Sequence, residues 1–178
     1  MNILDISQNS VKAGATHIDI KVRESVVHDV VSIEVSDNGC GMSDELLESV
    51  IDPFVTTRTT RKVGLGIPLV RQLTLDTDGR FDLRSKVGEG TVLFAEFRLS
   101  HLDRPPIGDI SSTLVTLISS APNIRYVYTH VTDTGDFVFD TDEVKTMLDG
   151  VPIESPEILV WLGEYLLENL NSIEGGKI

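Results

Sequence analysis

The alternation of hydrophobic and polar residues predicts short helices and strands along the first hundred residues. Residues 2–13 repeat apolar side chains with helical period, and Gly14 is a typical helix stop. Residues 17–23 and 30–36 alternate apolar and polar side chains with period two, as strands do when one face of their sheet is buried. The other elements expected here are a helix between Ser43 and Pro53, a helix over residues 67–75 and strands over residues 81–85 and 91–99.

This order of elements predicts an α+β fold, a two-layer α/β sandwich with a mostly antiparallel sheet and helices on one face. Pro105 and Pro106 stop both a helix and a central strand, so we expect residues 1–102 to form one domain and residues 103–178 a smaller α/β region. That region is expected to contain a helix over residues 111–119, a hairpin of residues 124–131 and 136–140, a short helix capped by Thr141 and a helix from Ser155 to Asn171.

The last of these helices has an apolar stripe that needs cover. Leu159, Leu162, Leu166 and Trp161 lie on or beside the stripe. Since so much exposed apolar surface is unfavourable, we expect residues 103–178 to pack against the first domain.

Composition and charge exclude several classes of protein. The chain has 178 residues, 40% of them hydrophobic and 24% charged, with one cysteine, Cys40, and four scattered histidines, so neither a disulfide nor a zinc site is expected. Residues 1–5 do not form a signal peptide and no apolar run approaches ~20 residues, so we expect a cytoplasmic protein that does not enter the membrane.

Most of the net charge of −13 falls in the second part of the chain. Residues 101–178 contain 13 acidic and 4 basic side chains, against 15 and 11 in residues 1–100. Nucleic acids and anionic membranes bind surplus Lys and Arg, so neither is expected as a partner. An acidic surface could instead dock a protein partner, although solubility alone also explains it.

Four short clusters, in a fixed order and at junctions of the expected elements, point to a function. They are Asp5-x-x-x-Asn9, Asp37-x-Gly39-x-Gly41, Asp52-Pro53-Phe54 with Thr56-Thr57 ahead of Gly64-Leu65-Gly66, and Gly88-x-Gly90-Thr91. Together they resemble the GHKL superfamily of histidine kinases, gyrase-type topoisomerases, MutL-type repair proteins and heat-shock chaperones. The resemblance implies a Bergerat-type sandwich that binds ATP and Mg²⁺ within residues 1–100.

The resemblance assigns a role to each cluster. Asp37 would recognise the adenine amino group, Met42 would pack on the ring, and Thr91 would contact the base pocket. Asn9 would hold Mg²⁺, which prefers hard oxygen ligands, and Lys12 would neutralise phosphate. The residues expected to bind the nucleotide are Asn9, Lys12, Asp37, Gly39, Gly41, Met42, Phe54, Thr57, Arg58, Gly64, Leu65, Gly66 and Thr91.

The reaction is less determined than the ligand. Asp5 lies where repair proteins and topoisomerases have a glutamate general base, which makes it the candidate catalytic residue for ATP hydrolysis. Only four residues precede Asp5, so we expect any phosphate acceptor to be a separate protein.

Two branches of the superfamily compete. Residues 13–20 resemble MutL-type proteins, whereas the short step from Phe54 to Gly64 is similar to histidine kinases. Three hypotheses follow. The chain is a Mg²⁺-dependent ATPase or protein histidine/serine kinase that acts on a partner, a non-hydrolysing ATP-gated switch of anti-sigma type, or a MutL-like DNA-transaction ATPase.

Overall fold

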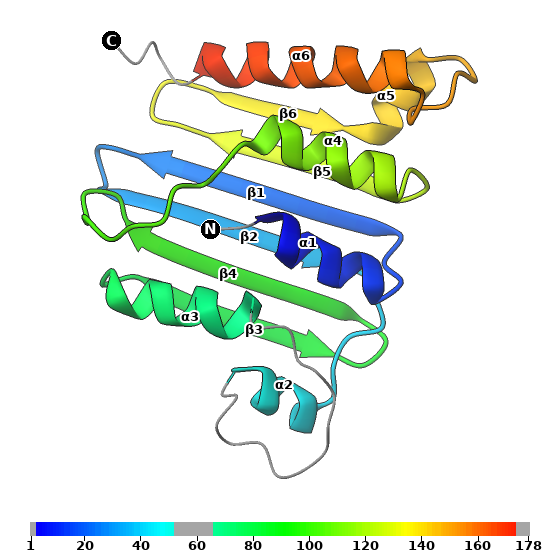
Figure 1. Ribbon diagram of the computed structural model, residues 1–178. Coiled ribbons are helices and arrows are strands. Elements are labelled where there is room, and N and C mark those ends of the chain that lie inside the picture. Colours follow the sequence, from blue (N-terminus) through cyan, green and yellow to red (C-terminus); the bar gives the residue numbers. More distant parts are fainter. Residues whose placement is uncertain (1–2, 52–65, 174–178) are drawn as a thin grey trace.

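One sheet with helices packed on one of its faces organises the chain (Figure 1). The structure is a computed structural model that describes residues 3–51 and 66–173. The strands are β1 (His17–Ser25), β2 (Val30–Asp37), β3 (Arg80–Lys86), β4 (Gly90–Arg98), β5 (Arg125–Val131) and β6 (Asp136–Asp140). The helices are α1 (Ile3–Lys12), α2 (Asp44–Ile51), α3 (Gly66–Asp76), α4 (Ile110–Ser120), α5 (Thr141–Met147) and α6 (Pro156–Ile173).

The sheet has the strand order β3-β4-β2-β1-β5-β6. Four of the five neighbouring pairs are antiparallel, and β1 and β5 are parallel. The predicted two-layer α/β sandwich with a mostly antiparallel sheet is therefore confirmed. Since β5 hydrogen-bonds directly to β1, the expected packing of the second part of the chain against the first is also confirmed. The division at residue 102 into two domains stays a prediction.

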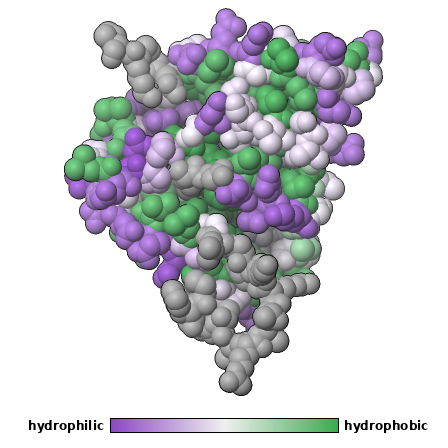
Figure 2. Space-filling model, viewed as in Figure 1, coloured by the Kyte–Doolittle hydropathy of each residue, from purple (hydrophilic) through white to green (hydrophobic). Residues whose placement is uncertain are grey.

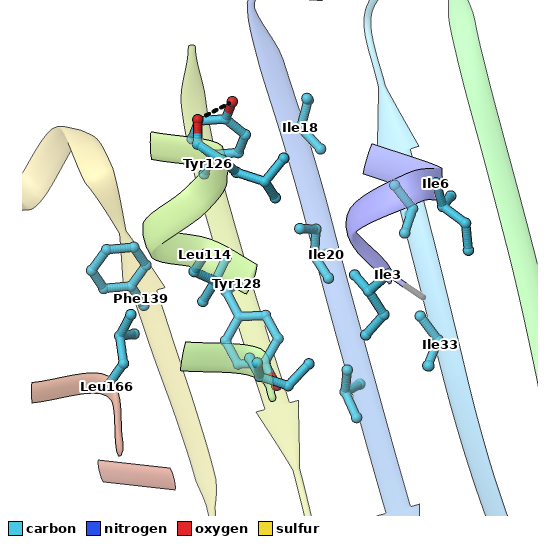
Figure 3. Close-up of a cluster of buried hydrophobic side chains, with 14 of the residues drawn as sticks. Ile3, Ile6, Ile18, Ile20, Ile33, Leu114, Tyr126, Tyr128, Phe139 and Leu166 are labelled. Carbon is cyan, nitrogen blue, oxygen red and sulfur yellow. Dashed lines mark hydrogen bonds between the residues drawn. The ribbon is translucent and has the colours of Figure 1, made fainter. Parts of the chain in front are cut away.

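Period-two burial along the strands builds the core. Ile18, Ile20 and Val22 of β1 are at most 1% exposed, while the residues between them face the open side of the sheet. Helix α1 packs on this buried face through Ile3 and Ile6, as Figure 3 shows. Burying one such side chain contributes about 1.5–3 kcal/mol to stability. The contacts of Ile3 and Ile6 therefore hold α1, and the polar side chains on its other faces, in a fixed position on the sheet.

The two tyrosines of β5 continue this core beneath α4. Tyr126 and Tyr128 are fully buried, close to Leu114 and Phe139 in Figure 3. The Tyr126 hydroxyl donates to the Leu117 carbonyl oxygen at 3.2 Å, which satisfies the polar end of the ring. Burial raises the pKa of the Tyr126 phenol to about 12. The core therefore runs without a break from β1 into the C-terminal part.

One correction concerns the start of α5. Thr141 was expected to cap this helix, but the N-cap is Asp140, whose carboxylate accepts from the Asp142 backbone N–H at 2.9 Å. Thr141 is instead the first helical residue, and its hydroxyl accepts from the backbone N–H of Tyr126. Asp140 takes the capping role because its extended backbone aims the carboxylate at the first turn, where Arg125 also binds it.

The turn between β5 and β6 is hydrogen-bonded to the turn between β1 and β2. The Asp133 carboxylate accepts from the Ser25 hydroxyl at 2.6 Å and from the Val26 and Val27 backbone N–H groups at 2.7 and 3.0 Å. The hydrogen bond from Ser25, followed by that from Val27, lowers the pKa of Asp133 below its ordinary value of 3.8. Asp133 is thus a second link, besides the sheet, between the two parts of the chain.

We expect the free energy of unfolding to fall as the pH drops below about 4. Hydrogen bonds lower the folded-state pKa of four carboxyl groups, those of Asp29, Asp109, Asp133 and Asp140. Their contribution is complete above 3.8, the unfolded value, and is lost as the pH falls through the lower folded values. Urea denaturation at several pH values measures this dependence.

The variant Asp133→Asn isolates one of these groups. Its stability should change less between about pH 5 and about pH 3 than that of the parent protein, because one proton fewer is taken up on unfolding. Equal pH dependence in the two proteins would contradict the assignment of Asp133.

Candidate functional site

A cavity of about 530 Å³ opens at the end of the sheet between α1, α2 and α3. Its walls are mainly apolar and include Ile6, Val35, Met42, Val50, Leu83 and Leu93. Among residues 3–51 and 66–173, the polar groups that line it are few: Asn9, Ser10, Lys12, Asp37 and Thr91. An apolar slot of this size with a small number of placed polar groups is typical of a small-molecule site.

Asp37 is fixed at the inner end of the cavity as the last residue of β2. Its Oδ2 accepts from the Ser10 hydroxyl at 2.5 Å, and its Oδ1 accepts from the Gly39 backbone N–H at 2.8 Å. Each carboxylate oxygen has a further lone pair, so the group can accept one more hydrogen bond from a ligand. The arrangement suits recognition of an N–H donor against an apolar wall.

The loop after Asp37 is hydrogen-bonded to the segment that follows α1 and to the β3–β4 turn. The Asn38 side-chain oxygen accepts from the backbone N–H groups of Thr16 and His17, both at 2.9 Å. The Cys40 backbone N–H donates to the Ala13 carbonyl oxygen at 2.9 Å, and its own carbonyl oxygen accepts from Gly88. The loop is therefore anchored to the end of α1 and to the β3–β4 turn.

Two glycines are required by the protein's own packing. A Cβ on Gly41, which has φ +65°, would lie 1.9 Å from the Lys86 carbonyl oxygen. A Cβ on Gly90, which has φ +107°, would lie 1.9 Å from the Asp37 carbonyl oxygen. Such contacts are impossible, so glycine lets the β3–β4 turn press directly on the Asp37 loop. The sequence analysis assigned Gly41 only to nucleotide binding.

Sequence reasoning missed Ser85, which organises the far wall. Its hydroxyl oxygen accepts from the Met42 backbone N–H at 2.9 Å and is 2.9 Å from both the Gly90 carbonyl oxygen and the Thr91 hydroxyl. A hydroxyl has one proton. If Ser85 donates to Gly90, it accepts from Thr91, and the Thr91 oxygen then faces the cavity as an acceptor. The sequence holds no signal for Ser85, because a serine in a strand is commonplace.

Ser10 was missed for a similar reason. It is 4% exposed in the last turn of α1, where the helical period alone predicts an apolar residue. A serine on the same helical face as Ile6 is expected to be buried, and buried hydroxyl groups are hydrogen-bonded, so this position could have indicated a polar partner in the sheet below the helix.

Helix α1 brings two predicted residues to the cavity and holds a third outside its lining. Asn9 and Lys12 line the cavity at its outer side. Asp5 is exposed in the first turn of α1 and is not among the described lining residues. The structure thus brings Asn9 and Lys12, but not Asp5, to the wall that Asp37 and Thr91 share.

The remaining predicted residues divide into two sets. Gly39 is buried beside Asp37, and Gly66 is the first residue of α3, next to Ile67 in the cavity wall. The other predicted residues, Phe54, Thr57, Arg58, Gly64 and Leu65, lie outside the described residues.

Comparison with known proteins identifies the family of the first part of the chain. Residues 2–103 match the family described as histidine kinase-, DNA gyrase B-, and HSP90-like ATPase. The chain belongs to this family. Its first part is therefore an ATP-binding domain of the histidine kinase-like ATPase family, and the proposed GHKL membership is confirmed.

Individual relatives match over the same region. The chain is 29% identical over 111 residues to the non-motile and phage-resistance protein of Caulobacter vibrioides, covering 57% of this chain and 13% of that protein. It is 29% identical over 102 residues to the autoinducer 2 sensor kinase/phosphatase LuxQ of Vibrio vulnificus, covering 52% and 12%. Among solved structures, the N-terminal domain of a DNA repair protein aligns with a TM-score of 0.48 at 16% identity, covering 75% and 49%. The chain spans less than a fifth of each of these two relatives.

The described residues suit Mg²⁺ only in company with phosphate. No cluster of three His, Cys, Asp or Glu residues that could hold a metal ion occurs within residues 3–51 and 66–173. Mg²⁺ in nucleotide sites binds chiefly phosphate oxygens and water, with one or two protein ligands, so a single amide oxygen, as predicted for Asn9, would be sufficient. Within the same two ranges, no helix is long and apolar enough to cross a membrane.

We expect Ser10→Ala to weaken ATP binding at least about tenfold while leaving the fold intact. Loss of the 2.5 Å hydrogen bond frees the Asp37 carboxylate to rotate, and a hydrogen bond to a charged group is worth about 1.5 kcal/mol or somewhat more. Titration with a fluorescent ATP analogue measures the change. Ser112→Ala, at an exposed position of α4, is the matched control and should bind as the parent does. Unchanged affinity in Ser10→Ala would contradict a positioning role.

Proposed function

We propose that the cavity binds Mg·ATP and that the chain acts with a separate protein partner, as an ATPase or protein kinase. One observation supports the ligand most strongly. The Asp37 carboxylate, held by Ser10 and Gly39, ends an apolar slot formed by Val35, Leu93 and Met42. A purine has flat apolar faces and an amino donor at its edge, so this slot complements adenine, and a guanine oxygen at the same place would meet the carboxylate with repulsion.

The outer end of the cavity supports the placement of the phosphates. Asn9 supplies an amide oxygen for Mg²⁺ and Lys12 supplies a positive charge. Lys12 makes no ion pair with any residue in the described parts of the chain, so its ammonium group is available to a phosphate. Ile67, in the first turn of α3, lines the cavity, so the N-terminus of this helix is close to it. Helix N-termini favour anions. We therefore place the triphosphate between α1 and the start of α3.

A non-hydrolysing switch is the second candidate, and the position of Asp5 favours it. A general base must lie within hydrogen-bonding distance, about 3 Å, of the attacking water. Asp5 is exposed, one helical turn before Asn9, and it is not part of the described cavity wall. If Asp5 is no base, the chain either transfers phosphate to its partner without one or binds ATP as a regulatory signal.

A turnover assay with two variants distinguishes these functions. Hydrolysis or phosphotransfer that is lost in both Asp5→Asn and Asn9→Ala supports an enzyme with Asp5 as base. Activity that survives in Asp5→Asn and is lost in Asn9→Ala supports an enzyme that does not need it. Tight Mg²⁺-dependent binding without turnover, with or without partner, supports the switch. Absence of binding in the parent protein would contradict both.

The charge of the second part of the chain supports a protein partner. Segment 101–178 is strongly acidic, which disfavours nucleic acid and anionic membranes. An ATP-dependent function of this kind fits the cytoplasm, where Mg·ATP is abundant.

A further inference from the structure

A groove lies between α4 and α6, on the far side of α4 from the nucleotide helix α1. It has a volume of about 300 Å³ and a mostly apolar lining that includes Ser111, Val115, Leu159, Val160, Gly163 and Leu167. In Figure 2, hydrophobic residues are visible over α4 and α6 next to hydrophilic residues along the outer margin. We call this feature the α4–α6 groove.

The apolar side of the groove is more exposed than a monomer surface requires. Val160 and Leu167 are 65% and 54% exposed, and they share a stripe of α6 with Gly163. This stripe lies beside, and not within, the buried stripe of Leu162, Leu166 and Leu170. An apolar strip that the fold leaves uncovered next to its own core is a typical protein-binding surface.

Gly163 keeps the groove open at a cost to helix stability. Glycine in a helix interior is about 1 kcal/mol less favourable than alanine. A Cβ at this position would lie 3.8 Å from Val115 Cγ2 and 3.9 Å from Ser111 Oγ, which are ordinary contacts, so packing does not require glycine. The Ser111 hydroxyl donates to the Gly163 carbonyl oxygen at 2.8 Å and fixes the two helices at this point. The small residue thus leaves room for a side chain from outside.

One margin of the groove is acidic. Glu157, Glu164 and Glu168 follow one another along α6 at spacings of seven and four, directly beside the stripe of Val160 and Leu167. Neither α4 nor α6 contains a lysine, arginine or histidine. Two copies of this chain would bring two acidic rows together, so the charge disfavours a second copy and favours a basic partner.

We propose that the α4–α6 groove binds an amphipathic helix of a partner protein, with leucine-like side chains in the groove and lysine or arginine against the row of Glu157, Glu164 and Glu168. Two neighbouring helices present a groove that a third helix can fill through anchors at i, i+3, i+4 and i+7. This inference gives the chemistry of the partner that the proposed function invokes and rests on that function only for the existence of a partner.

Synthetic helical peptides test the proposal on the full chain. The first probe is an amphipathic peptide of about 18 residues with leucine on one face and lysine on its flanks, and the second replaces each lysine by glutamate. We expect the lysine peptide to bind at least about tenfold more tightly, and Gly163→Leu to weaken its binding at least about tenfold by filling the groove. Glu164→Lys with Glu168→Lys should reverse the preference between the peptides.

Matched controls separate this from general attraction. Glu45→Lys with Glu143→Lys changes the net charge equally on α2 and α5, and should alter lysine-peptide affinity by less than about threefold. An equal loss in that control, no loss in Gly163→Leu, or absence of peptide binding would overturn the proposal. So would a dimer in sedimentation that Gly163→Leu abolishes, because a second copy would then occupy the groove. ATP titration of the same samples reports the nucleotide site separately, so failure of one leaves the other readable.

Discussion

Replacing Asp37 by asparagine should weaken ATP binding by about 10- to 150-fold and leave the fold unchanged. Asparagine has the same shape, and its amide can still accept from the Gly39 N–H and donate to the Ser10 oxygen. It loses the charge and the acceptor on the side of Ser10 that an adenine amino group would use. A hydrogen bond to a charged group is worth about 1.5–3 kcal/mol, which gives the stated range.

Titration with a fluorescent ATP analogue measures this loss, and thermal melting checks the fold. Asp136→Asn is the matched control, because Asp136 is an exposed residue at the start of β6, far from the cavity. The control should bind as the parent does. If Asp37→Asn also kept the parent affinity, Asp37 would not recognise the base.

Replacing Gly90 by alanine should destabilise the protein by about 3 kcal/mol and lower the melting temperature by about 6–12 °C. The added Cβ would lie 1.9 Å from the Asp37 carbonyl oxygen, and both atoms belong to backbone that cannot move freely. Relief of the clash must separate the β3–β4 turn from the Asp37 loop. Nucleotide affinity should therefore fall together with stability.

Gly88→Ala provides a control two residues away in the same turn. Gly88 also has a positive φ, +79°, but nothing lies within 4 Å of its Cβ position. It should therefore incur only the backbone cost of about 1–2 kcal/mol and keep ATP affinity. Similar effects of the two substitutions in chemical denaturation would show that the contact with Asp37 is unimportant.

Local sequence patterns were sufficient to predict the elements and the sandwich. The period-two alternation in residues 17–23 and 30–36 identifies strands with one buried face, and β1 and β2 have that burial. The ordered clusters around Asn9, Asp37 and Thr91 were also enough to predict that these three residues lie around one cavity.

Contacts between distant segments could not be predicted in the same way. Nothing local in residues 125–131 indicates that β5 pairs in parallel with β1, since either sheet edge could accept it. Gly90 and Asp37 touch through a backbone contact across 53 positions, which no periodicity records. Ser10, Ser85 and Asp140 look like ordinary polar residues until the structure supplies their partners.

The exposed position of Trp161 is another consequence of tertiary packing. The pattern of α6 predicted that Trp161 needs cover, yet it is 44% exposed and stacks on Tyr165 at 5.3 Å. The helix is rotated so that Leu162, Leu166 and Leu170 take the core. Trp161 and the stripe of Val160 and Leu167 therefore remain exposed, consistent with a helix that supplies binding surface as well as core.

Calorimetric titration of the purified chain with Mg·ATP tests the central claim most directly. Two temperatures are needed, because a binding enthalpy near zero at one of them would hide the reaction. The structure of the cavity around Asp37 predicts saturable binding to one site per chain, weakened by about 10- to 150-fold in Asp37→Asn. No heat at either temperature with millimolar Mg·ATP would contradict it.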